Sequence, residues 1–235
     1  MTINGVDIST LGARQHRVEF GHQDIRFSNE WGIGATLPFM GVYSAGFKQM
    51  MITLVIKGET RSTILAARSA ILGMLTKPVI LNLDGNSHHF YGVLKNHKET
   101  EIIQRRWHNM DLTFDCYEYG ENVVASGNTS FSVNNPGTAV SPCIVKIVPG
   151  ASYTSIELGG ICRNPITGED MPVTIPDVSL GSDIILDGIT GLITEASALK
   201  DVDMWELPSL KPGATTITCN KSLMTITVTV RPIYI

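Results

Sequence analysis

Apolar and polar residues alternate along several stretches of this 235-residue chain, which is the pattern of a β-strand with one buried face. The alternation is clearest over residues 109–116, where the side chains expected to face a core are Met110, Leu112, Phe114 and Cys116. Residues 49–57 predict a second, largely buried strand, whose apolar side carries Met50, Ile52, Leu54 and Ile56.

One segment of the first half changes to helical spacing. Between residues 60 and 75, apolar side chains recur every three or four positions, at Ile64, Ala67, Ile71, Met74 and Leu75. Either Thr60 or Ser62 can accept backbone hydrogen bonds at the start of such a helix. Pro78 prevents continuation, because proline has no N–H and clashes with the preceding turn. We therefore predict one helix at 60–75.

A β-hairpin is expected directly after this helix. Residues 79–83 form a short apolar run, and a second strand is expected at 89–95. Between them, Asp84-Gly85 can adopt the positive φ angles that a tight hairpin turn requires. We therefore predict a hairpin with a tight turn at Asp84-Gly85.

The second half of the chain has a different composition. Residues 122–137 are rich in Ser, Asn, Thr and Gly, and Asn135-Pro136-Gly137 is a strong turn signal, so we expect domains at 1–121 and 122–235. Short strands separated by turn residues predict a β-sandwich in the second domain, at 143–148, 153–158, 171–175, 183–186 and 224–231. The fold class expected is mainly β, with one helix in the first domain.

Composition and charge exclude several classes of protein. The hydrophobic share of 43% and the charged share of 17% are those of a chain that folds throughout. A net charge of −4 provides no broad cationic surface for nucleic acid, and the densest basic cluster is only Arg105 and Arg106 beside Trp107. We find neither a secretory signal nor about 18 consecutive apolar residues, so we expect no membrane partner and synthesis in a cytoplasm.

The residues that most often bind metals are poorly spaced for that purpose. His88 and His89 are adjacent on a strand and point to opposite faces, so they cannot easily chelate one ion. No two cysteines have the two-residue spacing of zinc or redox sites, and we expect buried, reduced thiols at Cys116, Cys143, Cys162 and Cys219. We expect no metal and no cofactor.

Paired carboxylates are too far apart for glycoside hydrolysis. Asp111 and Asp115 face the same side of one strand about 13 Å apart at strand rise, against about 5 to 10 Å in glycosidases. Asp183 and Asp187 have the same spacing. Since motifs for a nucleophile elbow, a phosphate loop or a zinc helix are also missing, we do not expect an enzyme.

Three tryptophans leave two interpretations open. Trp31, Trp107 and Trp205 have flat apolar faces on which a sugar ring could stack. Tryptophan is equally common in cores and protein interfaces. A carbohydrate-binding module that recognises the host cell wall through Trp205 therefore stays an alternative.

The end of the chain resembles the C-terminus of phage distal tail proteins, the siphovirus-type tail components. The similar features are Pro-Ser-Leu-Lys-Pro-Gly at 208–213, Thr-Ile-Thr at 216–218 and a final Val-Arg-Pro-Ile-Tyr-Ile strand at 230–235. Val230 stands where an aromatic residue is common in that family, and Trp205-Glu206-Leu207 replaces a Phe-rich approach to the proline. Similar features also occur upstream, at 3–7, 77–78, 114–116, 134–138 and Pro142.

The resemblance implies a structural protein of the phage tail tip, assembled in the cytoplasm of a Gram-positive host. Such a protein forms a homo-oligomeric ring, commonly a hexamer, from its N-terminal domain, and its C-terminal galectin-like β-sandwich lies outside the ring. It joins the tail tube and the tape-measure protein to tail-associated or receptor-binding proteins of the baseplate or tip. It carries out no reaction.

Residues 31–47 are the expected ring interface. This Gly- and aromatic-rich stretch is more apolar than a monomer's loop needs, and its candidate contact residues are Trp31, Leu37, Phe39, Met40 and Phe47. The alternative is a loop packed on its own core.

Overall fold

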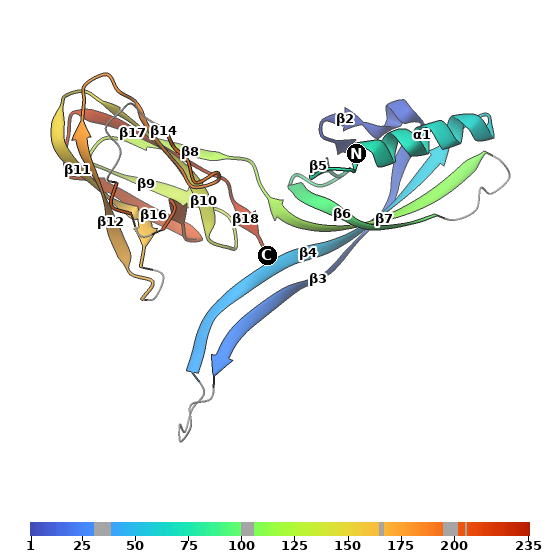
Figure 1. Cartoon of the computed structure of the whole chain (residues 1–235), viewed down its shortest axis with the longest axis horizontal. Coiled ribbons are helices and arrows are strands. Elements are labelled where there is room, and N and C mark those ends of the chain that lie inside the picture. The colour runs from blue at the N-terminus through green and yellow to red at the C-terminus, as the bar shows by residue number, and fades with distance from the viewer. Residues whose placement is uncertain (31–38, 100–105, 165–166, 195–201, 205) are drawn as a thin grey trace. The chain divides into compact units, whose positions relative to one another are not determined.

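The computed structural model describes residues 1–30, 39–99, 106–164, 167–194, 202–204 and 206–235 (Figure 1). It consists of two compact units, Met1–Tyr119 with Ile235, and Gly120–Tyr234. The composition change predicts a boundary near residue 121. Strands dominate both units, so the mainly-β prediction is confirmed. In the part of the chain described, no helix has the length and apolar character needed to cross a membrane.

The first unit is built on one antiparallel sheet, in the order β2-β1-β5-β6-β7-β4-β3. A short 3-10 turn, η1 (Ile8–Leu11), lies between β2 and β3. The strands are β1 (Thr2–Ile3), β2 (Val6–Asp7), β3 (Ala13–Glu30), β4 (Phe39–Lys57), β5 (Val79–Asn82), β6 (His89–Glu99) and β7 (Trp107–Tyr119).

One face of this sheet forms the core with α1 (Arg61–Met74), which lies across it in Figure 1. The alternation predicted for β4 and β7 is confirmed, because the fully buried side chains include Ile52, Leu54, Leu112 and Phe114. The helix contributes its predicted face to the same cluster, through Ile64, Ala67 and Ile71.

Thr60, rather than Ser62, caps the helix. The backbone N–H of Thr63 donates to Thr60 Oγ1 at 3.2 Å, and the backbone N–H of Thr60 donates to Thr63 Oγ1 at 3.2 Å. This reciprocal pair is a capping box, which satisfies donors that the first helical turn would leave unbonded.

The predicted hairpin between β5 and β6 forms, but its connection is wider than the tight turn expected at Asp84-Gly85. The connection spans residues 83–88, and Gly85 has a φ of 77°, while Asp84 does not share its positive φ. Asp84 is held by contacts outside the turn: its carboxylate pairs with the N-terminal amine of Met1, and its N–H donates to Gln15 Oε1 at 3.0 Å. These long-range contacts favour a wider loop than the local sequence predicts.

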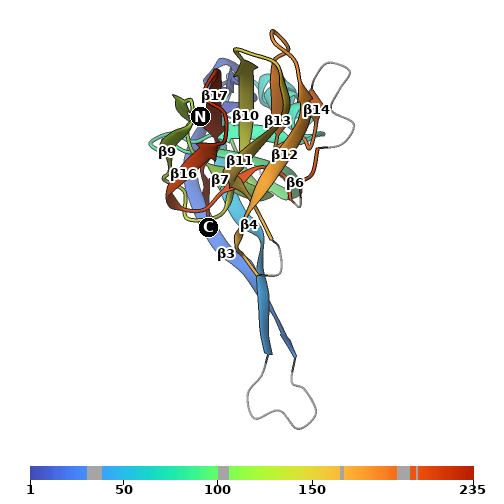
Figure 2. The ribbon, with the colours of Figure 1, turned by 90° about the vertical axis from the view of Figure 1, so that its left-hand side faces the viewer.

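The second unit contains two sheets around one core (Figure 2). One sheet has the order β14-β13-β10-β17-β8, with β15 beside β10, and the other has the order β12-β11-β16-β9. Both contribute fully buried side chains to the core, among them Val145, Val228, Ile156, Ile175 and Ile217. The strands are β8 (Val123–Gly127), β9 (Ser130–Asn135), β10 (Ser141–Pro149), β11 (Tyr153–Arg163), β12 (Asp170–Val178), β13 (Ile184–Asp187), β14 (Ile193–Thr194), β15 (Ser209–Leu210), β16 (Gly213–Cys219), β17 (Met224–Val230) and β18 (Ile233–Tyr234).

All four cysteines are free and buried, as predicted. Burial raises the pKa of Cys143 to about 12 and that of Cys116 to about 11, because a thiolate is poorly solvated inside either core. The Cys116 and Cys143 thiols therefore stay protonated and pack as small apolar groups.

The capping box leads to a test of helix stability. Thr60→Ala should lower the free energy of unfolding of the first unit by about 1 kcal/mol, because it leaves an N-terminal backbone donor unbonded. Urea unfolding followed by circular dichroism at the helical band would measure this. Ser62→Ala is the matched control and should change the free energy by less than about 0.5 kcal/mol; equal effects of the two substitutions would contradict the assigned cap.

Candidate functional site: the outer hairpin and its root

Strand β4 is much longer than the part of it that belongs to the sheet. Its pairing with β7 begins at Lys57↔Trp107 and ends at Lys48↔Cys116. Beyond Lys48, the described residues of β4 pair only with β3, as far as Glu30↔Phe39. We call residues 23–30 and 39–47 the outer hairpin; Figure 1 shows it running away from the rest of the first unit's sheet.

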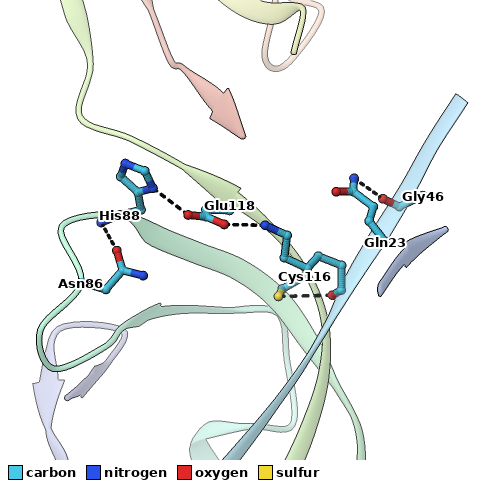
Figure 3. A network of polar contacts seen from close by, with 7 residues as sticks. Gln23, Gly46, Asn86, His88, Cys116 and Glu118 are labelled. Atoms are coloured by element: carbon cyan, nitrogen blue, oxygen red, sulfur yellow. Dashed lines mark hydrogen bonds and ion pairs between the residues drawn. The ribbon is translucent and has the colours of Figure 1, made fainter. Parts of the chain in front are cut away.

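Irregular pairing marks the root of the outer hairpin. The β3–β4 register shifts between Phe20 and Gln23 and again between Gln23 and Ile25. Such bulges bend a strand and increase its twist. Across this bend, Gln23 Nε2 donates to the carbonyl oxygen of Gly46 at 2.9 Å (Figure 3). The two strands thus remain joined where they leave the sheet.

A polar network fixes the same root to the sheet (Figure 3). Lys48 Nζ donates to Glu118 Oε2 at 2.6 Å, and His88 Nδ1 donates to Glu118 Oε1 at 2.6 Å. The backbone N–H of His88 in turn donates to Asn86 Oδ1 at 2.9 Å. The Cys116 thiol lies 3.4 Å from the carbonyl oxygen of Lys48. Glu118 therefore connects β4, β7 and the turn before β6.

The network keeps Glu118 ionised. Partial burial acts to raise the pKa of this carboxyl, but hydrogen bonds from Lys48 and His88 outweigh burial and hold the pKa below its usual range. The side chains of Lys48 and Glu118 are only 16% and 14% exposed. Water therefore screens this ion pair less than it screens a pair on the open surface.

The structure places the predicted interface residues only in part. Phe47 is 63% exposed and lies next to Lys48, at the base of the outer hairpin. Phe39 and Met40 belong to β4, opposite Glu30 and Asn29, so this part of the stretch is a strand and not the expected loop. Pairing with β3, which local sequence does not reveal, accounts for the difference. Trp31, Leu37 and Trp205 lie outside the described residues.

The predicted separation of the paired histidines is confirmed. His88 contacts Glu118, whereas His89 Nδ1 donates to Asn82 Oδ1 at 2.5 Å. Among the residues described, no three His, Cys, Asp or Glu side chains are grouped so that they could hold a metal ion.

The acidic residues considered as pairs each have a separate structural partner. Thr53 Oγ1 donates to Asp111 at 2.7 Å, and Lys95 lies 3.2 Å from Asp115. In the second unit, Lys146 lies 2.8 Å from Asp183. Burial acts to raise the pKa of Asp187, but hydrogen bonds from Thr190 and from the N–H of Ile189 outweigh it and lower that pKa. These contacts give each of the four carboxylates a structural role in its own part of the fold.

Comparisons with known proteins identify the fold. No family model and no curated protein matches the chain. The crystal structure of the Dit protein of phage SPP1, described as a paradigm of the hub adsorption apparatus in Gram-positive infecting phages, has a TM-score of 0.72 and 16% identity, and the match covers 97% of each chain.

Two structures of the phage p2 baseplate in its activated conformation are also similar. The one with Sr has a TM-score of 0.50 and 11% identity over 96% of this chain and 92% of that chain. The one with Ca has a TM-score of 0.50 and 10% identity over 97% and 92%. The resemblance to distal tail proteins expected from the sequence is thus confirmed at the level of the fold.

The root network predicts a pH-dependent contribution to stability. Glu118→Gln should lower the free energy of unfolding of the first unit by about 2 kcal/mol at neutral pH, because it removes the carboxylate from a half-buried lysine. Since folding lowers the pKa of Glu118, the contribution is fully present above its ordinary value of 4.5 and disappears as the pH falls through the folded value.

Urea unfolding of wild type and variant between pH 7 and pH 3 would measure this difference. Glu59→Gln is the control, because Glu59 is exposed and has no ion pair among the described residues. A difference for Glu118→Gln that stays constant across this pH range would contradict the assigned network.

Proposed function

We propose that this protein is a structural component of a phage tail tip, a distal tail protein that acts as the hub between the tail tube and the baseplate or tip proteins. The observation that carries the proposal is the match to the SPP1 Dit protein over 97% of both chains, which includes both units. The order of motifs along the sequence supports the same role independently. The role requires no reaction and no cofactor.

In this proposal the first unit forms a closed homo-oligomeric ring, a hexamer. A ring needs a heterologous interface, in which one surface of each copy meets a different surface of the next. The outer hairpin can supply one of these surfaces, since an isolated two-stranded ribbon is only marginally stable in water without further strands or packing. Its contact residues would be Trp31, Leu37, Phe39, Met40 and Phe47.

The second unit would be the galectin-like domain and lie outside the ring. The two sheets of this β-sandwich enclose a core of their own, so it can present loops to partners without contributing to the ring. The partners proposed are the tail tube protein, the tape-measure protein and tail-associated or receptor-binding proteins. Its location would be the tail tip of the virion.

Carbohydrate binding is not favoured by any feature of the described residues. That alternative depended on an exposed Trp205, a residue outside the described part of the chain. The carboxylates considered for a hydrolase each contact a neighbouring side chain: Asp111 contacts Thr53, Asp115 contacts Lys95 and Asp183 contacts Lys146.

Light scattering during size-exclusion chromatography tests the proposed ring. The wild-type protein should elute as one closed oligomer with the mass of a hexamer. Phe47→Asp should convert it to smaller species, because a charge buried in an apolar interface is costly. Leu180→Asp is a matched control in the second unit, since Leu180 and Phe47 are both 63% exposed.

Three results decide this proposal. Assembly of the wild type and of Leu180→Asp, together with loss of assembly in a folded Phe47→Asp, supports both the ring and its interface. A wild-type protein that stays monomeric at high concentration would overturn the ring. Normal assembly of Phe47→Asp would contradict the assignment of Phe47 to the interface.

A further inference from the structure

A cavity lies at the opposite end of the β4–β7 pairing from the outer hairpin. The register sets Lys57 opposite Trp107 on β7, and Val55 opposite Arg14 on β3. These four residues alternate with core residues such as Ile56 and therefore lie on the sheet face that α1 does not cover. The cavity measures about 870 Å³, and we call it the Trp107 pocket.

The backbone around the Trp107 pocket is held in place by hydrogen bonds. The N–H of Lys57 donates to the carbonyl oxygen of Gly12 at 2.8 Å. The N–H of Gly58 donates to the carbonyl oxygen of Arg106 at 3.2 Å. Gly12 has a φ of 72°, and a Cβ there would lie 2.7 Å from the Lys57 carbonyl oxygen. The pocket is therefore preformed rather than created by mobile side chains alone.

Positive charge is concentrated in this pocket. The Arg14 guanidinium carbon lies 5.7 Å from the centre of the Trp107 ring, and Lys57 Nζ lies 5.2 Å from it. Arg106 adds a third cation to the lining, and Glu59 is the one carboxylate among the lining residues described.

In the part of the chain that the structure describes, these three cations form no ion pair, unlike several others. Within the described residues, no carboxylate lies within 4.0 Å of them, whereas Lys48, Arg68 and Lys146 are each paired. Three cations around one carboxylate repel one another in a protein whose net charge is −4. An anionic ligand would relieve this repulsion.

The lining also has an apolar part. Val55 is only 7% exposed although it lies outside the main core cluster, and it lines the pocket together with Trp107. Aromatic and arginine side chains are the residues that most often anchor protein partners. A volume of this size holds a few side chains, which differs from the extended basic stripe that tracks a nucleic-acid backbone.

We infer that the Trp107 pocket binds a short acidic peptide segment of a neighbouring tail protein, an inference that rests on the proposed function. Carboxylates of the segment would pair with Arg14, Lys57 and Arg106. An apolar side chain of the segment would pack on Trp107 and Val55. The pocket would thus attach a partner at the end of the sheet away from the outer hairpin.

Fluorescence anisotropy on the full-length protein tests this inference. The probe is a fluorescein-labelled peptide of alternating glutamate and leucine, and its counterpart has glutamine in place of glutamate. We expect saturable binding of the acidic peptide alone, weakened by salt. Lys57→Glu and Arg106→Glu should each reduce the affinity by about tenfold or more. Lys77→Glu is the matched control, an exposed charge reversal in the same unit that should leave binding unchanged.

The remaining outcomes separate this inference from the proposed function. Equal binding of both peptides, or unchanged binding by folded Lys57→Glu and Arg106→Glu, would overturn the inference. Binding of an oligothymidine in place of the acidic peptide would overturn it in favour of a nucleic-acid site. Light scattering on the same samples reports the ring: assembly without peptide binding contradicts only the pocket, and peptide binding without assembly contradicts only the ring.

Discussion

The pairing register between β4 and β7 is the constraint on which the first unit depends. It runs from Lys57↔Trp107 to Lys48↔Cys116 and alternates residues between the core under α1 and the opposite face. At one end of this ladder β4 continues into the outer hairpin, and at the other end the Trp107 pocket opens. A shift of one residue would exchange the two faces of the sheet. It would therefore disrupt both the root of the outer hairpin and the Trp107 pocket.

Close approach of β6 to β7 supports the same register. Gly92 lies opposite Cys116, and a Cβ on it would come within 2.4 Å of the Asp115 carbonyl oxygen and 2.5 Å of Cys116 Cβ. Only glycine fits there without displacing β7. Because Cys116 is also the last residue of β7 to pair with β4, a displacement would reach Lys48 and the root of the outer hairpin directly.

The sequence predicts what depends on local order and misses what depends on register. Alternation located the buried faces of β4 and β7, and helical spacing located α1. Lys48 and Glu118 are 70 residues apart in the chain, so nothing in the local pattern of either residue indicates the ion pair that joins them. For the same reason the outer part of β4 was expected as a loop, since its strand character comes from β3. Arg105 and Arg106 beside Trp107 form the densest basic cluster of the sequence, but only the fold brings Arg14 and Lys57 to Arg106 and Trp107.

The position of the root network fits the role in assembly that we propose for the outer hairpin. A ribbon of two strands bends and twists easily, and ordering it only on contact with a neighbour would lower the affinity by the entropy lost. Lys48, Glu118 and His88 fix the ribbon where it leaves the sheet, so less conformational entropy would be lost on forming the proposed ring. In the proposed ring, the half-buried ion pair would favour assembly by preorganising the hairpin, although it lies on the sheet and not in the proposed interface.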